Sequence, residues 1–115
     1  MSTHQRQQTL KTAAHHSQEC ESICIASIQY CLQTGGKHTE PNHMRLLQDC
    51  ADSCESSAKL FARGSQFNGG VGNLCAEVCD DCAASCDKFA NDPQMKACAD
   101  ACRACAAACR QAAAV

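Results

Sequence analysis

Small and apolar residues recur every three or four positions along four segments of this 115-residue chain. That spacing places side chains on one face of an α-helix. Glycines and prolines separate the segments, at residues 35–36, 41, 64, 69–72 and 93, and such residues end or interrupt helices. We therefore expect an all-α fold of four helices.

The length of the chain fits one domain with one core, which we place over residues 1–115. Connections between consecutive segments are short, and short connections join antiparallel neighbours. The sequence therefore predicts an antiparallel up-down-up-down four-helix bundle, with its core at about residues 16–112.

Residues that favour helix ends mark the first two helices. The first should begin within the first dozen residues and run to about Thr34, where Gly35 can adopt the left-handed conformation that closes a helix. The second should use Asn42 as its N-cap, after a proline, and stop at Gly64.

The start of the third helix is open, because Ser65 and Asn73 are both suitable caps and the glycines between them weaken a helix. We expect this helix to end near Ala90. The fourth helix has the clearest start, with Asp92 as N-cap and Pro93 at the first helical position, and it continues almost to the C-terminus.

Cysteine defines the inward face of each helix. Residues 75–86 and 98–109 each carry cysteines at i, i+4, i+7 and i+11, which fall on one stripe of a helix. The same template fits two earlier segments, where Ser27, Ser57 and Phe61 replace cysteine. Charged residues fall off the stripe, so we expect it to be buried. All thirteen cysteines lie on the sixteen template positions: Cys20, Cys24, Cys31, Cys50, Cys54, Cys75, Cys79, Cys82, Cys86, Cys98, Cys102, Cys105 and Cys109.

Aligning the four copies of the template predicts four layers of side chains in the core. The thiol column would span about 16 Å, from eleven residues at a rise of about 1.5 Å each. The expected layers are Cys31, Cys50, Cys86 and Cys98; Ser27, Cys54, Cys82 and Cys102; Cys24, Ser57, Cys79 and Cys105; and Cys20, Phe61, Cys75 and Cys109.

The two ends of this column should differ. Helix connections gather His38, His43, Met44 and Met95 beyond the Cys31 layer, and His43 and Met95 fall on the inward stripe. Their imidazole and thioether groups make that end soft and polar. The opposite end should be closed in part by a phenylalanine.

Charge and composition limit the partners. Ten basic and twelve acidic residues without a block of either sign argue against nucleic acid or an anionic membrane as a partner. No secretory signal or bilayer-spanning segment is visible, so we expect a cytoplasmic protein. In a reducing cytosol, and with an odd number of cysteines, a disulfide framework is disfavoured.

The thiols favour Cu(I) as the ligand. Thiolate is a soft donor suited to Cu(I), one monovalent ion per thiolate is neutral, and sulfurs shared between ions would give a capacity on the order of one ion per cysteine. Cysteines four apart on a helix can each form a two-coordinate site. Cysteine as a mere core filler is disfavoured, because leucine or alanine would pack without oxidative risk.

Other functions stay open. A layer of four thiolates could hold tetrahedral zinc, although each site would carry two net negative charges in a low-dielectric core. Cys75, Cys79 and Cys82 have the spacing of the radical SAM motif, which holds an iron–sulfur cluster. That motif lies on a loop of much larger enzymes, so an iron–sulfur cluster is disfavoured here. A thiol-based redox or metal-sensing interaction protein would need exposed, reactive thiols. No nucleophile–base–orienter arrangement is visible, so we expect no enzyme.

The repeated CxxxCxxCxxxC pattern on helices of a short, Ala-rich bundle resembles the copper storage protein family, Csp. The resemblance implies a core filled with Cu(I), with all thirteen cysteines as ligands and with His or Met residues near one open end associated with metal uptake. His43 and Met95 are the candidates for that role. The resemblance further implies a homotetramer of the cytosolic type, with a capacity lowered by the three template positions that lack cysteine.

Overall fold

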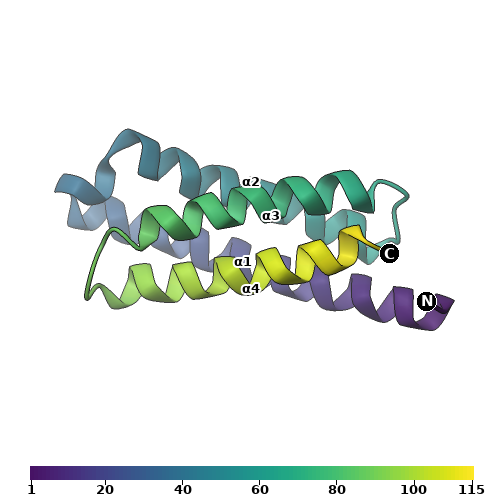
Figure 1. Cartoon of the computed structure of the whole chain (residues 1–115). Coiled ribbons are helices and arrows are strands. Elements are labelled where there is room, and N and C mark those ends of the chain that lie inside the picture. The colour runs from purple at the N-terminus through teal and green to yellow at the C-terminus, as the bar shows by residue number, and fades with distance from the viewer.

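Four α-helices form an antiparallel bundle in the computed structural model, which describes all 115 residues (Figure 1). The helices are α1 (Thr3–Thr34), α2 (Pro41–Ala62), α3 (Asn68–Cys86) and α4 (Pro93–Ala113), and a short 3-10 helix, η1 (Gly36–Thr39), lies between α1 and α2. Helices α1 and α3 each pack against both α2 and α4. The predicted fold class is therefore confirmed.

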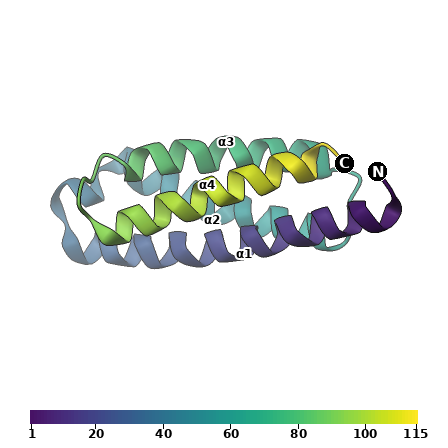
Figure 2. The same cartoon turned by 60° about the horizontal axis from the view of Figure 1, so that its bottom comes forward.

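The bundle is long and narrow, with extents of 49 × 20 × 17 Å. Helix α1 is the longest and projects past the other helices at its N-terminal end, and both chain ends lie at the same end of the bundle (Figure 2). No helix combines the length and the apolar character needed to cross a membrane.

The expected signals set the C-terminal end of α1 and the start of α4. Gly35 follows α1 with φ of 73°, and Asp92 caps α4 by accepting a hydrogen bond from the Met95 N–H at 3.1 Å. At the start of α1, Ser2 and Gln5 form a capping box, in which each side chain accepts from the other residue's backbone N–H. This box satisfies two of the free donors of the first turn.

The start of α2 differs from the prediction. Glu40, not Asn42, is the N-cap, and its two carboxylate oxygens accept from the N–H groups of Asn42 and His43 at 2.9 and 3.0 Å. A carboxylate can accept both bonds at once and also favours the positive end of the helix dipole. The helix ends at Ala62, two residues before Gly64.

Both predicted caps of α3 are wrong, because the helix begins at Asn68 without a side-chain cap. The hydroxyl of Ser65 accepts from the N–H of Phe67 and shapes the turn before the helix, while Asn73 lies within the helix. The helix also stops earlier than expected, at Cys86, and the chain then turns towards α4 through Asn91, which has φ of 64°.

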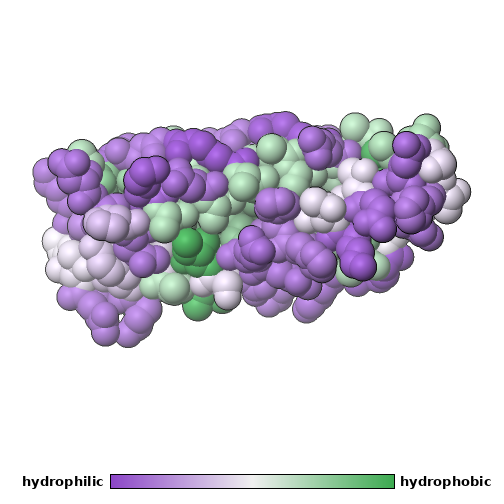
Figure 3. All heavy atoms as spheres, turned by 90° about the horizontal axis from the view of Figure 1, so that it is seen from below, coloured by the Kyte–Doolittle hydropathy of each residue, from purple (hydrophilic) through white to green (hydrophobic).

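The inward face is the cysteine stripe, as predicted. The core contains all thirteen cysteines, flanked mainly by alanines, and it extends back to Leu10, which is buried at the N-terminal end of α1. Charged residues lie outside, and two ion pairs, Asp80 with Arg110 and Asp87 with Arg103, connect α3 to α4. One face of the molecule is mostly polar, with a small strongly hydrophobic cluster (Figure 3).

Gly72 permits the close contact between α3 and α4. A Cβ atom at this position would lie 2.8 Å from the carbonyl oxygen of Cys109 and 3.0 Å from the Cβ of Ala113. A Cβ at the nearby Gly70 would meet nothing within 4 Å. The glycines that were expected to weaken the start of α3 therefore lie inside the helix, and one of them is required by packing.

We expect Gly72→Ala to destabilise the reduced, metal-free protein by about 1–3 kcal/mol, because the helices must move apart to accept the methyl group. The matched control, Gly70→Ala, should leave the free energy of unfolding unchanged or raise it by up to about 1 kcal/mol, since alanine favours the helix. Urea unfolding under anaerobic conditions measures both. Equal midpoints for the two variants would contradict this account of the contact.

Candidate metal centre

All thirteen cysteines are free thiols inside the bundle. Cys86 is 1% exposed and the other twelve are 0% exposed. A cysteine that reacts with oxidants in solution needs a partly exposed thiol with a lowered pKa. The burial of the whole set therefore disfavours a surface redox sensor.

Three sulfurs from three helices form a nearly equilateral triangle at the middle of the column. Cys20 Sγ on α1 lies 3.8 Å from Cys50 Sγ on α2 and 3.8 Å from Cys102 Sγ on α4, and the third side is also 3.8 Å. An ion at the centre would lie about 2.2 Å from each sulfur, close to the metal–thiolate distance of about 2.3 Å known for zinc. The apo geometry is thus near that of a three-coordinate site.

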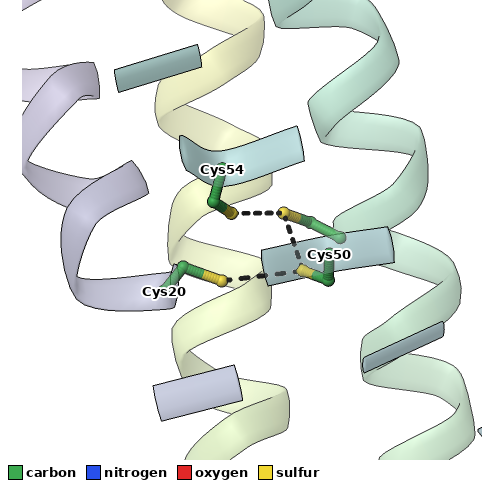
Figure 4. A group of neighbouring side chains, drawn as sticks. Cys20, Cys50 and Cys54 are labelled. Atoms are coloured by element: carbon green, nitrogen blue, oxygen red, sulfur yellow. Dashed lines mark hydrogen bonds between the residues drawn. The ribbon is translucent and has the colours of Figure 1, made fainter. Parts of the chain in front are cut away.

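A second triangle lies beside the first. Cys54, Cys75 and Cys79 have sulfur separations of 3.8, 3.9 and 3.9 Å. Cys50 joins the two triangles, with its sulfur 3.6 Å from that of Cys79. Figure 4 shows the sulfurs of Cys20, Cys50 and Cys54 directed into the space between the helices.

Further contacts extend the column in both directions from these triangles. Cys24 and Cys98 meet at 4.0 Å on one side, and Cys105 and Cys109 at 3.7 Å on the other. Four sets of four thiols have all their sulfurs within 4.8 Å of one another. The sets are Cys20, Cys50, Cys54 and Cys79; Cys20, Cys24, Cys50 and Cys102; Cys24, Cys82, Cys98 and Cys102; and Cys54, Cys75, Cys79 and Cys105.

The register of the column differs from the one that the template predicted. Cys102 was expected in a layer with Ser27 and Cys54, but it contacts Cys20 and Cys50. Relative to α4, helix α1 is therefore displaced by seven residues, about two turns, and α2 by four residues, about one turn. The four predicted layers are wrong in this respect.

The connection between α1 and α2 explains the displacement. In an antiparallel pair with a short connection, residues equally far from the connection face each other. Cys31 lies three residues before the end of α1 and His43 two residues after the start of α2, and these two meet, whereas the template paired Cys31 with Cys50. Between α3 and α4 the alignment is correct, since Cys79 and Cys105 share a set.

Three template positions without cysteine also point inward. Ser27 and Ser57 are fully buried and Phe61 is 1% exposed. Ser27 accepts a hydrogen bond from the side chain of Gln94 at 3.0 Å, but the buried hydroxyl of Ser57 has no partner. These residues interrupt the thiols of α1 and α2 as the sequence predicted.

Ser17 belongs to the column although the sequence analysis missed it. Its side chain is fully buried, and Oγ lies 3.7 Å from the sulfurs of Cys105 and Cys109. The signal was available, because Ser17 lies three residues before Cys20, one step of the same helical stripe. Ser17 takes a fifth position on the α1 stripe, next to the four of the template, where a further thiol would continue the column.

At one end of the column, His43 and Met95 lie against Cys31. His43 Nε2 is 3.6 Å from Cys31 Sγ, and Met95 Sδ is 4.0 Å from the same sulfur. All three side chains are buried, so burial lowers the pKa of His43 and raises the pKa of the Cys31 thiol to about 11. A neutral imidazole, a thiol and a thioether therefore form a soft donor set.

A second layer of side chains covers this set. The carboxylate of Asp92 accepts from the Tyr30 hydroxyl at 2.9 Å and contacts His38 Nε2 at 2.8 Å. The ring of Phe89 lies between those of His38 and His43, at 4.2 and 4.8 Å between centroids. Asp92 thus ties η1 to the start of α4 above the Cys31 end.

Met44, the fourth soft residue expected at this end, is only partly buried and packs against the outside of the core. At the far end of the column the side chains of Leu10, Phe61 and Ala112 are buried and make this end more apolar. The predicted difference between a soft, polar end and an apolar end is therefore present.

Ionisation of one thiol affects its neighbours throughout the column. Hydrogen bonds from surrounding thiols, that of Cys102 first, lower the pKa of Cys20, while Cys102 and then Cys20 raise the pKa of Cys24. Neighbouring S–H groups stabilise one thiolate, and that thiolate then opposes the next. Without bound cations the column cannot ionise throughout, so metal binding must displace protons.

These features define a cysteine-lined four-helix bundle whose core donors suit soft metal ions. Comparison with known proteins identifies the family. Residues 6–114 match the model of the copper storage protein family, Csp. The chain therefore belongs to the copper storage protein family.

Three solved structures are similar to this chain. The Nmul_A1745 protein from Nitrosospira multiformis is 38% identical, with a TM-score of 0.86 and coverage of 93% of this chain and 96% of that one. The Cu(I)-bound copper storage protein BsCsp3 is 30% identical, with a TM-score of 0.84 and coverage of 91% and 98%. A cytosolic copper storage protein from Streptomyces lividans, with five coppers, is 28% identical, with a TM-score of 0.82 and coverage of 96% of each chain.

The unpaired hydroxyl of Ser57 leads to a prediction about core stability. We expect Ser57→Ala to leave the free energy of unfolding unchanged or to raise it by up to about 1 kcal/mol, because a buried donor without a partner is removed. Ser17→Ala should lower it by about 0.5–1.5 kcal/mol, since that hydroxyl contacts two thiols. Anaerobic urea unfolding of the apo protein compares them, and a larger loss for Ser57→Ala would contradict the assignment.

Proposed function

We propose that this chain binds and stores many Cu(I) ions in the core of its bundle, through the thiolates of its thirteen cysteines. The observation that carries the proposal is the continuous column of buried sulfurs, with contacts of 3.6 to 4.0 Å across and along the helices. Membership of the copper storage protein family and the copper-loaded relatives support the same function.

The overlap of the four-thiol sets favours Cu(I) over zinc. Six cysteines belong to two sets each, and the four sets draw on only ten cysteines. Separate tetrahedral ions need four thiolates apiece, so at most two of these sets can be filled at once. Cu(I) accepts two or three shared thiolates, which lets neighbouring ions use the same sulfur.

Charge balance points the same way. Each Cu(I) that replaces a thiol proton leaves the charge of the core unchanged, because a monovalent cation replaces a proton. A zinc ion on four thiolates adds two negative charges to a water-free core. A narrow bundle can therefore hold many Cu(I) ions but few tetrahedral zinc ions.

The Cys31 end is the proposed site of metal uptake, with His43 and Met95 as ligands beside Cys31. Its support is the soft donor set that these side chains form, at separations of 3.6 and 4.0 Å from the Cys31 sulfur. Leu10, Phe61 and Ala112, which are buried at the other end, are apolar and cannot act as ligands. Ions would pass from His43 and Met95 to the thiols deeper in the column.

We further propose that the chain is a non-enzymatic store formed by a single domain, and that it acts in the cytoplasm as a homotetramer. The family supports a storage role, and the relative from Streptomyces lividans is cytosolic. Large apolar side chains remain exposed in the isolated chain, with Ile25, Leu32, Leu74 and Phe67 between 53% and 65% exposed. Contacts between copies would cover part of this surface.

Anaerobic titration of the reduced protein with Cu(I), against a competing chelator, should reach on the order of one ion per cysteine. Parallel titration with Zn²⁺ should stop at about two ions, the number of tetrahedral sets that can be filled at once. The unfolding temperature should rise with Cu(I), because the ions bind only the folded core. Saturation with Cu(I) at two to four ions would favour a zinc-like function instead.

Light scattering coupled to size-exclusion chromatography tests the proposed assembly. Four chains of 12.2 kDa should elute as one species, with or without Cu(I). A monomer at micromolar concentration would refute the tetramer and leave the storage proposal unaffected. Rapid labelling of most thiols in the folded apo protein would instead favour the redox or metal-sensing alternative.

A further inference from the structure

We infer that Ser85 is a positioning residue for His43, and that its hydroxyl accepts the Nδ1 proton when Nε2 turns its lone pair to a metal ion beside Cys31 and Met95. The inference rests on the proposed role of His43 as a ligand and adds a residue that lies off the cysteine stripe. Ser85 Oγ lies 2.7 Å from His43 Nδ1, and both side chains are buried, at 4% and 2% exposure.

The chemistry of a neutral imidazole makes this contact consequential. One ring nitrogen carries a proton and the other a lone pair, so a ring that binds metal through Nε2 must keep its proton on Nδ1. In a buried site that N–H needs an acceptor, and the hydroxyl of Ser85 is in place to accept it. Without the hydroxyl, the metal-binding tautomer would bury an unsatisfied donor.

The alternative tautomer cannot bind metal at this site. Its proton lies on Nε2, directed at the Cys31 sulfur 3.6 Å away, and the Ser85 hydroxyl would then donate to Nδ1. Metal binding therefore selects the Nδ1–H form, and the Ser85 hydroxyl can change from donor to acceptor to satisfy it. The ring of His43 is buried with one polar contact at each nitrogen, so the position of the proton decides which nitrogen can bind metal. Outer hydrogen-bond partners of ligating histidines commonly fix this choice in metal sites.

Packing supports the orientation of the ring. The Phe89 ring lies 4.8 Å from the imidazole at an angle of 47°, which limits rotation of the side chain. The backbone N–H of His43 is held by Glu40. With Ser85 included, each of the four helices contributes to the Cys31 end: Cys31 from α1, His43 from α2, Ser85 from α3 and Met95 from α4.

The experiment compares Ser85→Ala with Ser85→Thr, which keeps a hydroxyl, by ¹⁵N NMR of the histidine side chains. In the Cu(I)-loaded wild-type protein and in loaded Ser85→Thr, His43 should be in the Nδ1–H form with Nε2 on the metal, and Ser85→Ala should lower the population of this form. With Cu(I) and a competing chelator, the midpoint for metal binding at His43 should weaken by about 10- to 100-fold in Ser85→Ala and be restored in Ser85→Thr. Ser27→Ala, another buried hydroxyl on a core-facing position, should change neither readout.

An unchanged tautomer and midpoint in Ser85→Ala would overturn the positioning role while leaving His43 as a ligand. If the ¹⁵N shifts of His43 in the wild-type protein do not respond to Cu(I), both the ligand role and the positioning role fail. Total Cu(I) capacity is measured in the same samples and reports separately on storage. Backbone amide spectra of each variant verify that the bundle is folded.

Discussion

The short reach of the cysteine side chain is the constraint on which this structure depends. A sulfur lies only two bonds from the Cα atom, so thiols on different helices can meet only if the helices are close together. Buried alanines flank the cysteine stripe on α2, α3 and α4, and Gly72 brings α3 against the backbone of Cys109. Small residues around the stripe are therefore as necessary for the sulfur column as the cysteines themselves.

The same constraint gives the core an unusual character. Most bundles exclude water with large aliphatic side chains. Here only Phe61, Leu47 and Met95 among the fully buried side chains are larger than cysteine. Packed thiols supply less apolar area than leucines would. Bound metal adds the cohesion that the side chains lack, which links folding to loading in one equilibrium.

Most of the fold could be predicted from helical periodicity. Cysteines at alternating steps of four and three residues lie on one face only if the segment is an α-helix. The Asp92–Pro93 start and Gly35 were also readable, since each signal is local. Caps formed by longer side chains could not be predicted in this way, and Glu40 caps α2 in place of the expected Asn42.

The sequence predicted which cysteines line the core and that His43 and Met95 face it at one end, but it predicted neither the register between helices nor the two serines, Ser17 and Ser85. Pairing between helices depends on the length and shape of each connection, which the cysteine repeat does not encode. His43 reaches Cys31 because η1 is compact, Met95 reaches it from the start of α4, and Ser85 joins them from a position outside the stripe. Ser17 extends the column where the repeat itself had stopped.

The compact connection between α1 and α2 has a consequence for how this family can vary. Because η1 fixes which residue of α1 faces Cys50, inserting one helical turn there would slide the whole α1 donor set along the other three helices. Thiols would then exchange partners, and serines would face different layers, without any ligand being mutated. The length of this connection could therefore change the number of metal clusters, and the number of ions in each, without any change in the ligands.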